Sequence, residues 1–254
     1  MRKIIFLSYL IMITSCLFAQ EINQHLEIDY EMVMEIDPEF VVSQIPYEYR
    51  KQFGELIREE LKEGIITEYK LKTDGKISIY KLQEKINNSQ TVSGTLINQI
   101  MEADKLPIYK LLEEKLFLKE YEFNQKKYLV RDSLKSFNWN ISKETEEIEG
   151  YQTFKSEGTI SDSIKVIAWY SPRVPYKDGP DEFWGLPGMI LKIQYEAGNN
   201  LHTITAKNIT VKENKLIIKL PKNKDFFTLE EYESIIKSFF EKRKEMNYGG
   251  VDKN

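Results

Sequence analysis

Three carboxylates are grouped in one short loop, where Asp178, Asp181 and Glu182 precede Trp184. A glycoside hydrolase needs two carboxylates that face each other across a sugar, and an aromatic ring often holds that sugar. The chain has 40 acidic residues, however, so nearby pairs arise by chance, and solvated loop charges are the favoured interpretation. A hydrolase acting on glycans or peptides through these carboxylates is therefore the alternative function, and no catalytic residue is assigned.

The sequence contains few of the residues that bind metals or carry out thiol chemistry. The two histidines, His25 and His202, lie far apart and in different expected strands, and Cys16 is the only cysteine. Structural and catalytic zinc sites need three or four clustered ligands of these types. No zinc-protease, nucleophile-elbow or phosphate-loop motif is present either. The sequence therefore predicts neither a metal nor a cofactor.

The same loop, residues 176–190, is rich in glycine, proline and aromatic residues. Glycine allows close backbone approach and proline fixes φ, so the segment encodes a loop of defined shape. It is either a rim with aromatic anchors for a ligand or partner, or a buried corner that caps the core. The candidate binding residues are Trp169, Tyr170, Pro175, Gly179, Pro180, Phe183, Trp184, Gly185, Leu186, Pro187 and Gly188.

The elements that must position this loop are mostly strands. Apolar and polar residues alternate along much of the chain, which is typical of strands with one buried face. Asp74-Gly75 predicts a tight hairpin turn. The expected strands cover 26–37, 65–73, 77–82, 116–123, 127–131, 150–159, 164–170, 189–196, 201–211 and 216–220, with a further alternation over 137–141.

Two amphipathic helices complete the expected architecture. One has apolar residues at helical spacing from Ile45 to Leu61 and closes near Gly64, and the other begins at a Thr228 capping box. Residues 84–110 are interpreted as a connection with a short helix near 96–101. Tight turns require antiparallel neighbours. We therefore predict a mainly β (α+β) single domain, a long curved antiparallel meander sheet with a helix from the N-terminal half and a C-terminal helix packed on it.

The N-terminus predicts export. Arg2 and Lys3 precede an apolar run that ends at Leu17-Phe18-Ala19, which is typical of a signal peptide over residues 1–19, so that 20–254 form the domain. In the alternative, Cys16 becomes a lipidated N-terminus. We expect a periplasmic or outer-membrane-associated protein with no transmembrane segment after signal cleavage. Acidic and basic residues are interleaved at a net charge of −4, which argues against nucleic-acid binding.

A family resemblance enters at the loop. Gly185-Leu186-Pro187-Gly188-Met189-Ile190 resembles the signature of the GLPGLI (Porph_ging-type) family of exported proteins from Gram-negative envelopes. The resemblance extends from about Phe137 to Tyr195, although Met189 stands where the family usually has Leu. Further segments that resemble the family are Trp139, Glu149-Gly150-Tyr151, Ala168-Trp169-Tyr170-Ser171-Pro172, Val174-Pro175-Tyr176 and Gly179-Pro180.

The resemblance implies an exported, β-rich protein of unassigned function and supplies no catalytic residues. The favoured function is thus a non-enzymatic binding or interaction module of the cell envelope. Its partner would be an envelope protein or a small apolar, peptide or glycan ligand.

Overall fold

One continuous antiparallel sheet forms the body of the molecule. The computed structural model describes residues 24–84, 91–160, 164–222 and 225–248. The strand order is β6-β5-β4-β3-β2-β1-β11-β10-β9-β8-β7. The strands are β1 (His25–Glu35), β2 (Ile65–Thr73), β3 (Ile77–Leu82), β4 (Ile108–Leu111), β5 (Leu116–Phe123), β6 (Lys126–Ser133), β7 (Asn140–Ile148), β8 (Tyr151–Ile160), β9 (Ile164–Ser171), β10 (Met189–Ala197) and β11 (Asn200–Lys212).

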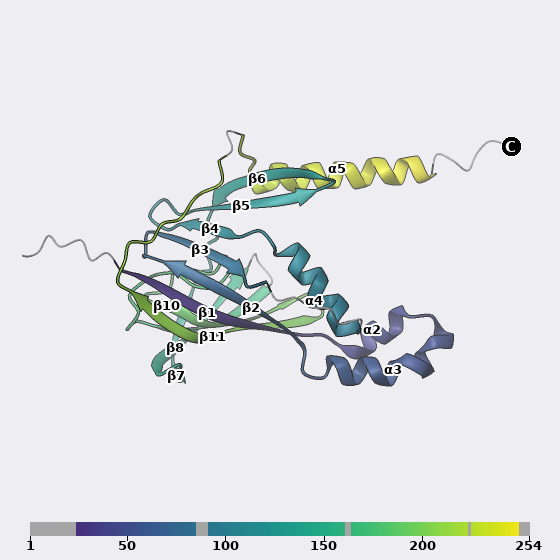
Figure 1. Ribbon diagram of the computed structural model, residues 1–254, viewed down its shortest axis with the longest axis horizontal. Helices are drawn as coiled ribbons and strands as arrows, with labels where there is room; N and C mark the ends of the chain where they lie inside the picture. The colour runs from purple at the N-terminus through teal and green to yellow at the C-terminus, as the bar shows by residue number, and fades with distance from the viewer. Residues whose placement is uncertain (1–23, 85–90, 161–163, 223–224, 249–254) are drawn as a thin grey trace, which may run out of the picture.

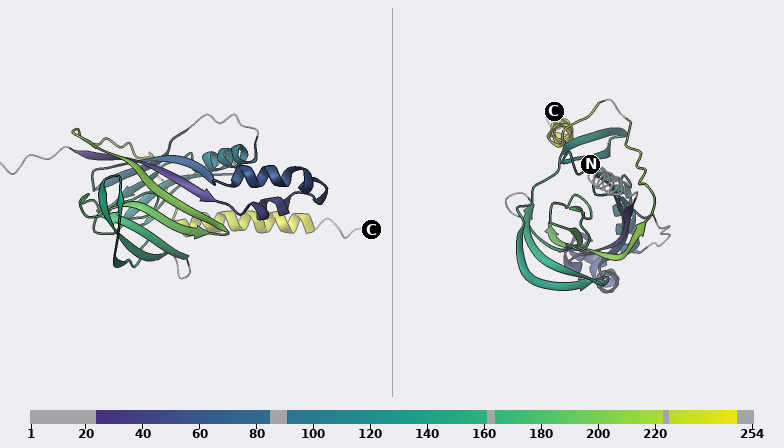
Figure 2. Two further views of the ribbon diagram at one scale, coloured as in Figure 1. Left: turned by 90° about the horizontal axis from the view of Figure 1, so that it is seen from below. Right: turned by 90° about the vertical axis from the view of Figure 1, so that its left-hand side faces the viewer.

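The chain crosses this sheet in two arms. It starts at the centre with β1 and moves outward to the edge strand β6, passes through residues 134–139 to the other edge strand β7, and returns to the centre with β11 beside β1. Seen from one end, the sheet curves around an interior that holds a loop (Figure 2). Register shifts at Asp29/Tyr30 and Ile190/Lys192 add local bending, as β-bulges do. The expected curved antiparallel meander is confirmed.

The concave side carries the core because the strands alternate. In β1, residues Leu26, Ile28, Tyr30 and Met32 are buried, whereas the residues between them are less so. In β2 and β3 the buried face includes Tyr69, Leu71, Tyr80 and Leu82. These side chains form the largest apolar cluster, together with residues of β10 and β11.

The helices lie at one end and one edge of the sheet. α2 (Pro38–Gln44), α3 (Tyr47–Leu61) and α4 (Val92–Ala103) gather beyond one end of β1 and β2, and α5 (Leu229–Tyr248) runs along β5 and β6 (Figure 1). The capping box at the start of α5 is confirmed: the Glu231 N–H donates to Thr228 Oγ1 (3.1 Å), and the Thr228 N–H donates to the Glu231 carboxylate (2.8 Å).

The N-terminal helical region differs from its expectation. Pro38 does end β1, but it also opens α2, because Asp37 caps the helix and proline suits its first turn. The helix expected from Ile45 is α3, which starts at Tyr47. Its buried face is Gly54, Ile57 and Leu61, whereas the expected apolar stripe residues Tyr49, Phe53 and Leu56 are 49%, 41% and 54% exposed.

Three other expectations are corrected. Residues 84–110 are more than a connection, because they contain α4 and the sheet strand β4; residues 85–90 lie outside the described chain. Residues 216–220 form no strand, since β11 already pairs with β1 and β10 and offers no free edge. Phe137 and Trp139, expected in an alternating strand, lie outside it, because β7 begins at Asn140. The expected signal peptide, residues 1–19, falls outside the described residues.

Candidate functional site

The segment between β9 and β10, residues 172–188, folds back into the concave side of the sheet (Figure 2). Its backbone is tied to the start of β10, because the Met189 N–H donates to Val174 O and the Ile190 N–H donates to Asp178 O, both at 2.9 Å. We call this segment the interior loop. Phe183 and Leu186 are buried and pack with β9 and β10. The buried part of the loop therefore fills one end of the interior, while other loop residues, such as Pro175 and Gly185, are exposed.

A buried ion pair anchors the interior loop. Lys110 of β4 places Nζ 2.7 Å from Asp178 Oδ1, and both side chains are fully buried. The ammonium also donates to Gly179 O at 2.6 Å, and the Gly179 N–H donates to the same carboxylate at 2.8 Å. Because separating two buried charges is costly, this pair joins the loop firmly to the sheet. The expectation that Asp178 is a solvated loop charge is therefore wrong.

A tyrosine from the central strand supports the same region. The Tyr30 hydroxyl donates to Ile190 O at 2.6 Å in the buried interior. Burial, and then the negative charge of Asp178, raise the pKa of Tyr30 well above its ordinary value. The hydroxyl thus stays protonated and keeps its bond to the start of β10.

The predicted rim residues divide between the interior and the surface. Tyr170, Gly179, Pro180, Phe183, Leu186 and Gly188 are buried; Trp169 and Trp184 are half-buried; Pro175, Gly185 and Pro187 are exposed. The indole N–H groups of Trp184 and Trp139 are hydrogen-bonded, since Trp184 donates to Lys135 O and Trp139 donates to Trp184 O. An open groove on this side is lined by Pro175, Trp184, Gly185, Leu186 and Pro187 together with Trp139 and Tyr176. The rim as a binding surface stays a prediction.

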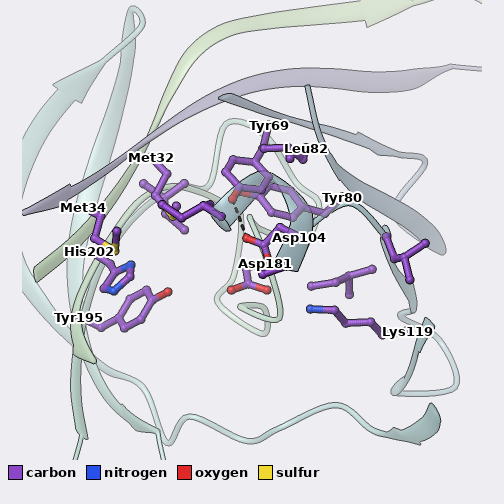
Figure 3. Close-up of a pocket in the computed structure, with 15 residues that line it drawn as sticks. Met32, Met34, Tyr69, Tyr80, Leu82, Asp104, Lys119, Asp181, Tyr195 and His202 are labelled. Atoms are coloured by element: carbon purple, nitrogen blue, oxygen red, sulfur yellow. Dashed lines mark hydrogen bonds between the residues drawn. The ribbon is translucent and has the colours of Figure 1, made fainter. Parts of the chain in front are cut away.

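The other end of the interior contains a cavity of about 250 Å³ (Figure 3). It lies between the concave face of the sheet, the end of α4 and the tip of the interior loop. The residues that line it are Met32, Met34, Tyr69, Tyr80, Leu82, Ile100, Ala103, Asp104, Leu106, Ile108, Lys119, Asp181, Tyr195, His202 and Ile204. We call it the interior cavity.

Two aromatic pairs and two carboxylates give the interior cavity its polar character. Tyr69 stacks on Tyr80 with ring centroids 4.9 Å apart, and Tyr195 stacks on His202 at 5.0 Å. Asp104 and Asp181 lie between these pairs in Figure 3. The Tyr69 hydroxyl donates to Asp104 Oδ2 at 2.7 Å, which orients that carboxylate.

Two polar atoms of this cavity are buried and lack a partner within the described chain. They are the hydroxyl oxygen of Tyr80, a residue that is 5% exposed, and Nδ1 of His202. Buried polar atoms in folded proteins are nearly always hydrogen-bonded, so orphans in a cavity point to a missing ligand or water. Burial lowers the pKa of His202, an effect that the Asp104 charge opposes, so the imidazole is neutral and offers one acceptor nitrogen.

Asp181 has the most perturbed carboxyl of the site. It takes a left-handed backbone conformation, with φ +52°, which Asp tolerates better than most residues. Burial, and then the negative charge of Glu182, raise its pKa to about 6, while the Lys119 charge lowers it. A carboxyl with such a pKa can change protonation state near neutral pH, which suits acid–base chemistry or pH-dependent binding.

Sequence reasoning identified Asp181 as a loop carboxylate but missed the rest of the cavity. Tyr69 and Tyr80 carried a usable signal, because they fall on the buried face of alternating strands, where a tyrosine hydroxyl usually needs a hydrogen-bond partner. Asp104 lay in the region interpreted as a connection. No cluster of three or more His, Cys, Asp or Glu residues able to hold a metal occurs within the described chain.

The fold and the site define a class: a curved antiparallel sheet whose concave side holds an inserted loop and a small polar cavity. Residues 130–192 match the model of the Porph_ging family, described as a protein of unknown function. The resemblance to the GLPGLI type is thereby confirmed. A search of curated proteins found no match.

The fold is similar to part of a solved structure, that of PNGF-II. PNGF-II, in its C2 crystal form, has a TM-score of 0.52 at 15% identity, with 84% of this chain covered. The chain spans about a third of the length of PNGF-II, 32%. An uncharacterized conserved protein from Thermus thermophilus gives a TM-score of 0.38 at 8% identity, covering 81% of this chain and 91% of the other. Among the described helices, none combines the length and apolar character needed to cross a membrane.

Proposed function

We propose that this protein is a binding module that holds a small organic ligand in the interior cavity. The observation that carries the proposal is a pair of buried polar atoms, Tyr80 Oη and His202 Nδ1, that have no partner among the described residues and lie beside two carboxylates. Ligand sites are typically concave and mostly apolar with a few convergent polar groups. Met32, Leu82 and Ile204 supply the apolar wall.

The surroundings of the interior cavity favour a site that exists before the ligand arrives. The Lys110–Asp178 pair holds the interior loop against the sheet on one side. On the other side, Glu60 of α3 accepts hydrogen bonds from the first N–H groups of α4, Val92 at 2.8 Å and Ser93 at 3.2 Å. A helix end that is capped by a neighbouring element is fixed in position. Preformed walls lower the entropic cost of binding.

The experiment compares ligand-observed NMR spectra with and without a blocked cavity. Mixtures of monosaccharides, amino acids and small amines would be screened against wild type and Leu106→Trp, which places an indole at the cavity wall. Leu56→Trp, at a site 54% exposed on α3, is the matched control. We expect at least one compound to bind wild type and Leu56→Trp and to lose binding in Leu106→Trp. Equal binding by all three proteins, or no binding by any, would refute the proposal.

The proposed setting is the cell envelope. Support comes from the signal-like residues 1–19 and from the family resemblance. Intact-mass measurement of the protein recovered from its native cells tests it: cleavage after Ala19 gives one mass, and lipidation at Cys16 gives another. An uncleaved chain would contradict export. Within that setting, the groove beside Trp184 is the proposed contact for an envelope protein.

A hydrolase acting on glycans or peptides is the second candidate, favoured by one observation. Asp181 has a pKa of about 6 and shares the interior cavity with a second carboxylate, Asp104, and such pairs can divide acid and base roles. Trp184, the aromatic ring that the sequence places next to these loop carboxylates, does not line this cavity. Nitrophenyl glycosides and peptide nitroanilides would be tested with wild type and Asp181→Asn. Turnover that disappears in the variant supports the hydrolase, and absence of turnover in wild type leaves binding as the function.

A further inference from the structure

We infer that the interior cavity recognises a primary ammonium group carried on a small apolar body. The inference rests on the proposed function, because it names the chemistry of the ligand in the same cavity. Three features of the cavity carry it: the kind of hydrogen-bonding atoms it leaves open, its balance of charge, and the aromatic and apolar surfaces around them.

The open hydrogen-bonding positions are mainly acceptors. Asp104 uses one oxygen for the Tyr69 hydroxyl, and its other oxygen has no donor within the described chain. Asp181 makes no hydrogen bond or ion pair there, and neutral His202 offers one acceptor nitrogen. Tyr80 Oη can also accept. A primary ammonium has three N–H donors and no acceptor, so it matches a set of this kind.

The charge balance points the same way. Asp104 and Asp181 are two carboxylates, and among the described residues Lys119 is the only cation that lines the interior cavity. Glu182 does not alter this balance, because its carboxylate pairs with Lys135 at 2.8 Å. Partly buried negative charge without a partner is unfavourable. An ammonium group between the two carboxylates would neutralise the excess, whereas a carboxylate ligand would add to it.

The aromatic surroundings suit a cation with an apolar tail. Tyr69, Tyr80 and Tyr195 line the cavity, and tyrosine rings attract cations that lie over their faces. Met32 and Ile204 provide apolar surface for the rest of the molecule. A cavity of about 250 Å³ limits the ligand to the size of a small aromatic or branched amine.

Three probes of similar size separate the charge from the shape: phenethylamine, its neutral isostere phenethyl alcohol, and phenylacetate. Isothermal titration calorimetry at about pH 8, where Asp181 with its pKa of about 6 is ionised, would measure each against wild type. We expect phenethylamine to bind at least roughly tenfold more tightly than the alcohol, since hydrogen bonds to charged groups are the stronger ones. Phenylacetate should not bind.

Variants then test which residues hold the ammonium. Asp104→Asn and Asp181→Asn keep size and shape, and Asn tolerates the left-handed backbone at 181. Each should weaken phenethylamine binding by roughly 10- to 100-fold while leaving the weak binding of phenethyl alcohol unchanged. Glu147→Gln, an exposed carboxylate on β7, is the matched control and should change nothing.

The outcomes distinguish the inference from the function on which it rests. Equal or tighter binding of phenethyl alcohol would overturn the ammonium inference and leave the cavity as a binding site. Phenethylamine binding that survives both Asp→Asn changes would place the amine elsewhere and likewise overturn it. Failure of all three probes, together with an empty NMR screen, would refute the binding function itself.

Discussion

Asp178 and Asp181 lie three positions apart in the interior loop, yet their surroundings differ sharply. Asp178 faces the filled end of the sheet, where Lys110 neutralises it and the Gly179 N–H donates to it. Asp181 faces the interior cavity, where it has no ion pair within the described chain. The same contrast holds for two tyrosine hydroxyls: Tyr30 is bonded to Ile190 O, and Tyr80 has no partner within the described residues.

This difference separates a structural region from a candidate functional one. At the filled end, Lys110 and the Gly179 N–H satisfy Asp178 Oδ1, and the Tyr30 hydroxyl is bonded, although Asp178 Oδ2 has no hydrogen-bond partner within the described residues. At the cavity end, polar groups are left open, and such groups lower stability unless a ligand completes them. A protein tends to depart from full internal satisfaction where it binds something.

The largest expected effect comes from breaking the buried pair. Lys110→Met should lower the free energy of unfolding by about 3–5 kcal/mol, because it leaves Asp178 buried without its cation. Urea denaturation measures it. Lys119→Met is the matched control: that lysine has no ion pair within the described chain, and its loss should cost less than about 1 kcal/mol. If both changes cost the same, Lys110 has no special role at the filled end.

The signature glycine Gly188 tests how tightly the interior loop is held against β9. A Cβ at this position would lie 2.3 Å from the Ser171 backbone oxygen. Gly188→Ala should therefore lower the free energy of unfolding by about 3 kcal/mol, since backbone atoms cannot yield as side chains do. Gly185→Ala is the comparison: its φ of +94° disfavours Ala, but the nearest atom, Trp139 Nε1, is 3.8 Å away.

We expect Gly185→Ala to cost about 1 kcal/mol, the usual effect of conformation alone. Thermal unfolding of the two variants measures the difference. A Gly188→Ala protein as stable as Gly185→Ala would show that the loop can move away from β9, and the filled end would then be less rigid than its contacts indicate.

The hydroxyls of Tyr30 and Tyr80 compare the two ends with the same chemical change. Tyr30→Phe removes a bond to Ile190 O and should cost about 1–2 kcal/mol. Tyr80→Phe removes a buried hydroxyl that has no partner in the described chain, so the ligand-free protein should be unchanged or more stable by about 1 kcal/mol. Chemical denaturation of both variants, without added ligand, measures these two changes in the free energy of unfolding. A loss at Tyr80 equal to that at Tyr30 would mean that the Tyr80 hydroxyl already has a partner, such as bound water.

The strand pattern could be predicted from sequence because it depends on local alternation. β1 and the Asp74-Gly75 hairpin follow from period-two burial and one turn. The failures are long-range. Lys110 and Asp178 come from segments far apart in the chain, and nothing near either residue shows that the other will neutralise it. The strand expected over 216–220 fails for a related reason, since only the finished sheet shows that β11 has no free edge.

The candidate site was less accessible to sequence reasoning than the fold. A loop rich in glycine, proline and aromatic residues stands out in the sequence, but its burial depends on the curvature of the whole sheet. Asp181 was recognised only as one of three similar carboxylates. What distinguishes it, the neighbourhood of Asp104 and the tyrosines, is assembled from separate strands and the end of a helix.

The smallest expected effect is the pH dependence that Asp181 confers on stability. Folding raises its pKa from the ordinary value of 3.8 to about 6, so in that interval the folded protein binds more protons at this group than the unfolded chain does. The free energy of unfolding should therefore fall as the pH rises from about 4 to about 6. Because Asp181 is partly exposed, we expect about 1 kcal/mol. The charged groups that act on the Asp181 carboxyl are Glu182, Lys119, Asp104 and Lys110.

Asp181→Asn cannot titrate, so the difference in unfolding free energy between wild type and variant isolates this group from other carboxyls. Urea denaturation at several pH values should show the variant gaining on wild type as the pH rises through the interval, with no further change above it. A constant difference would mean that folding leaves the pKa of Asp181 unchanged, so that its negative charge is already compensated in the ligand-free protein. The contrast with Asp178 would then vanish, and with it the charge argument for an ammonium ligand.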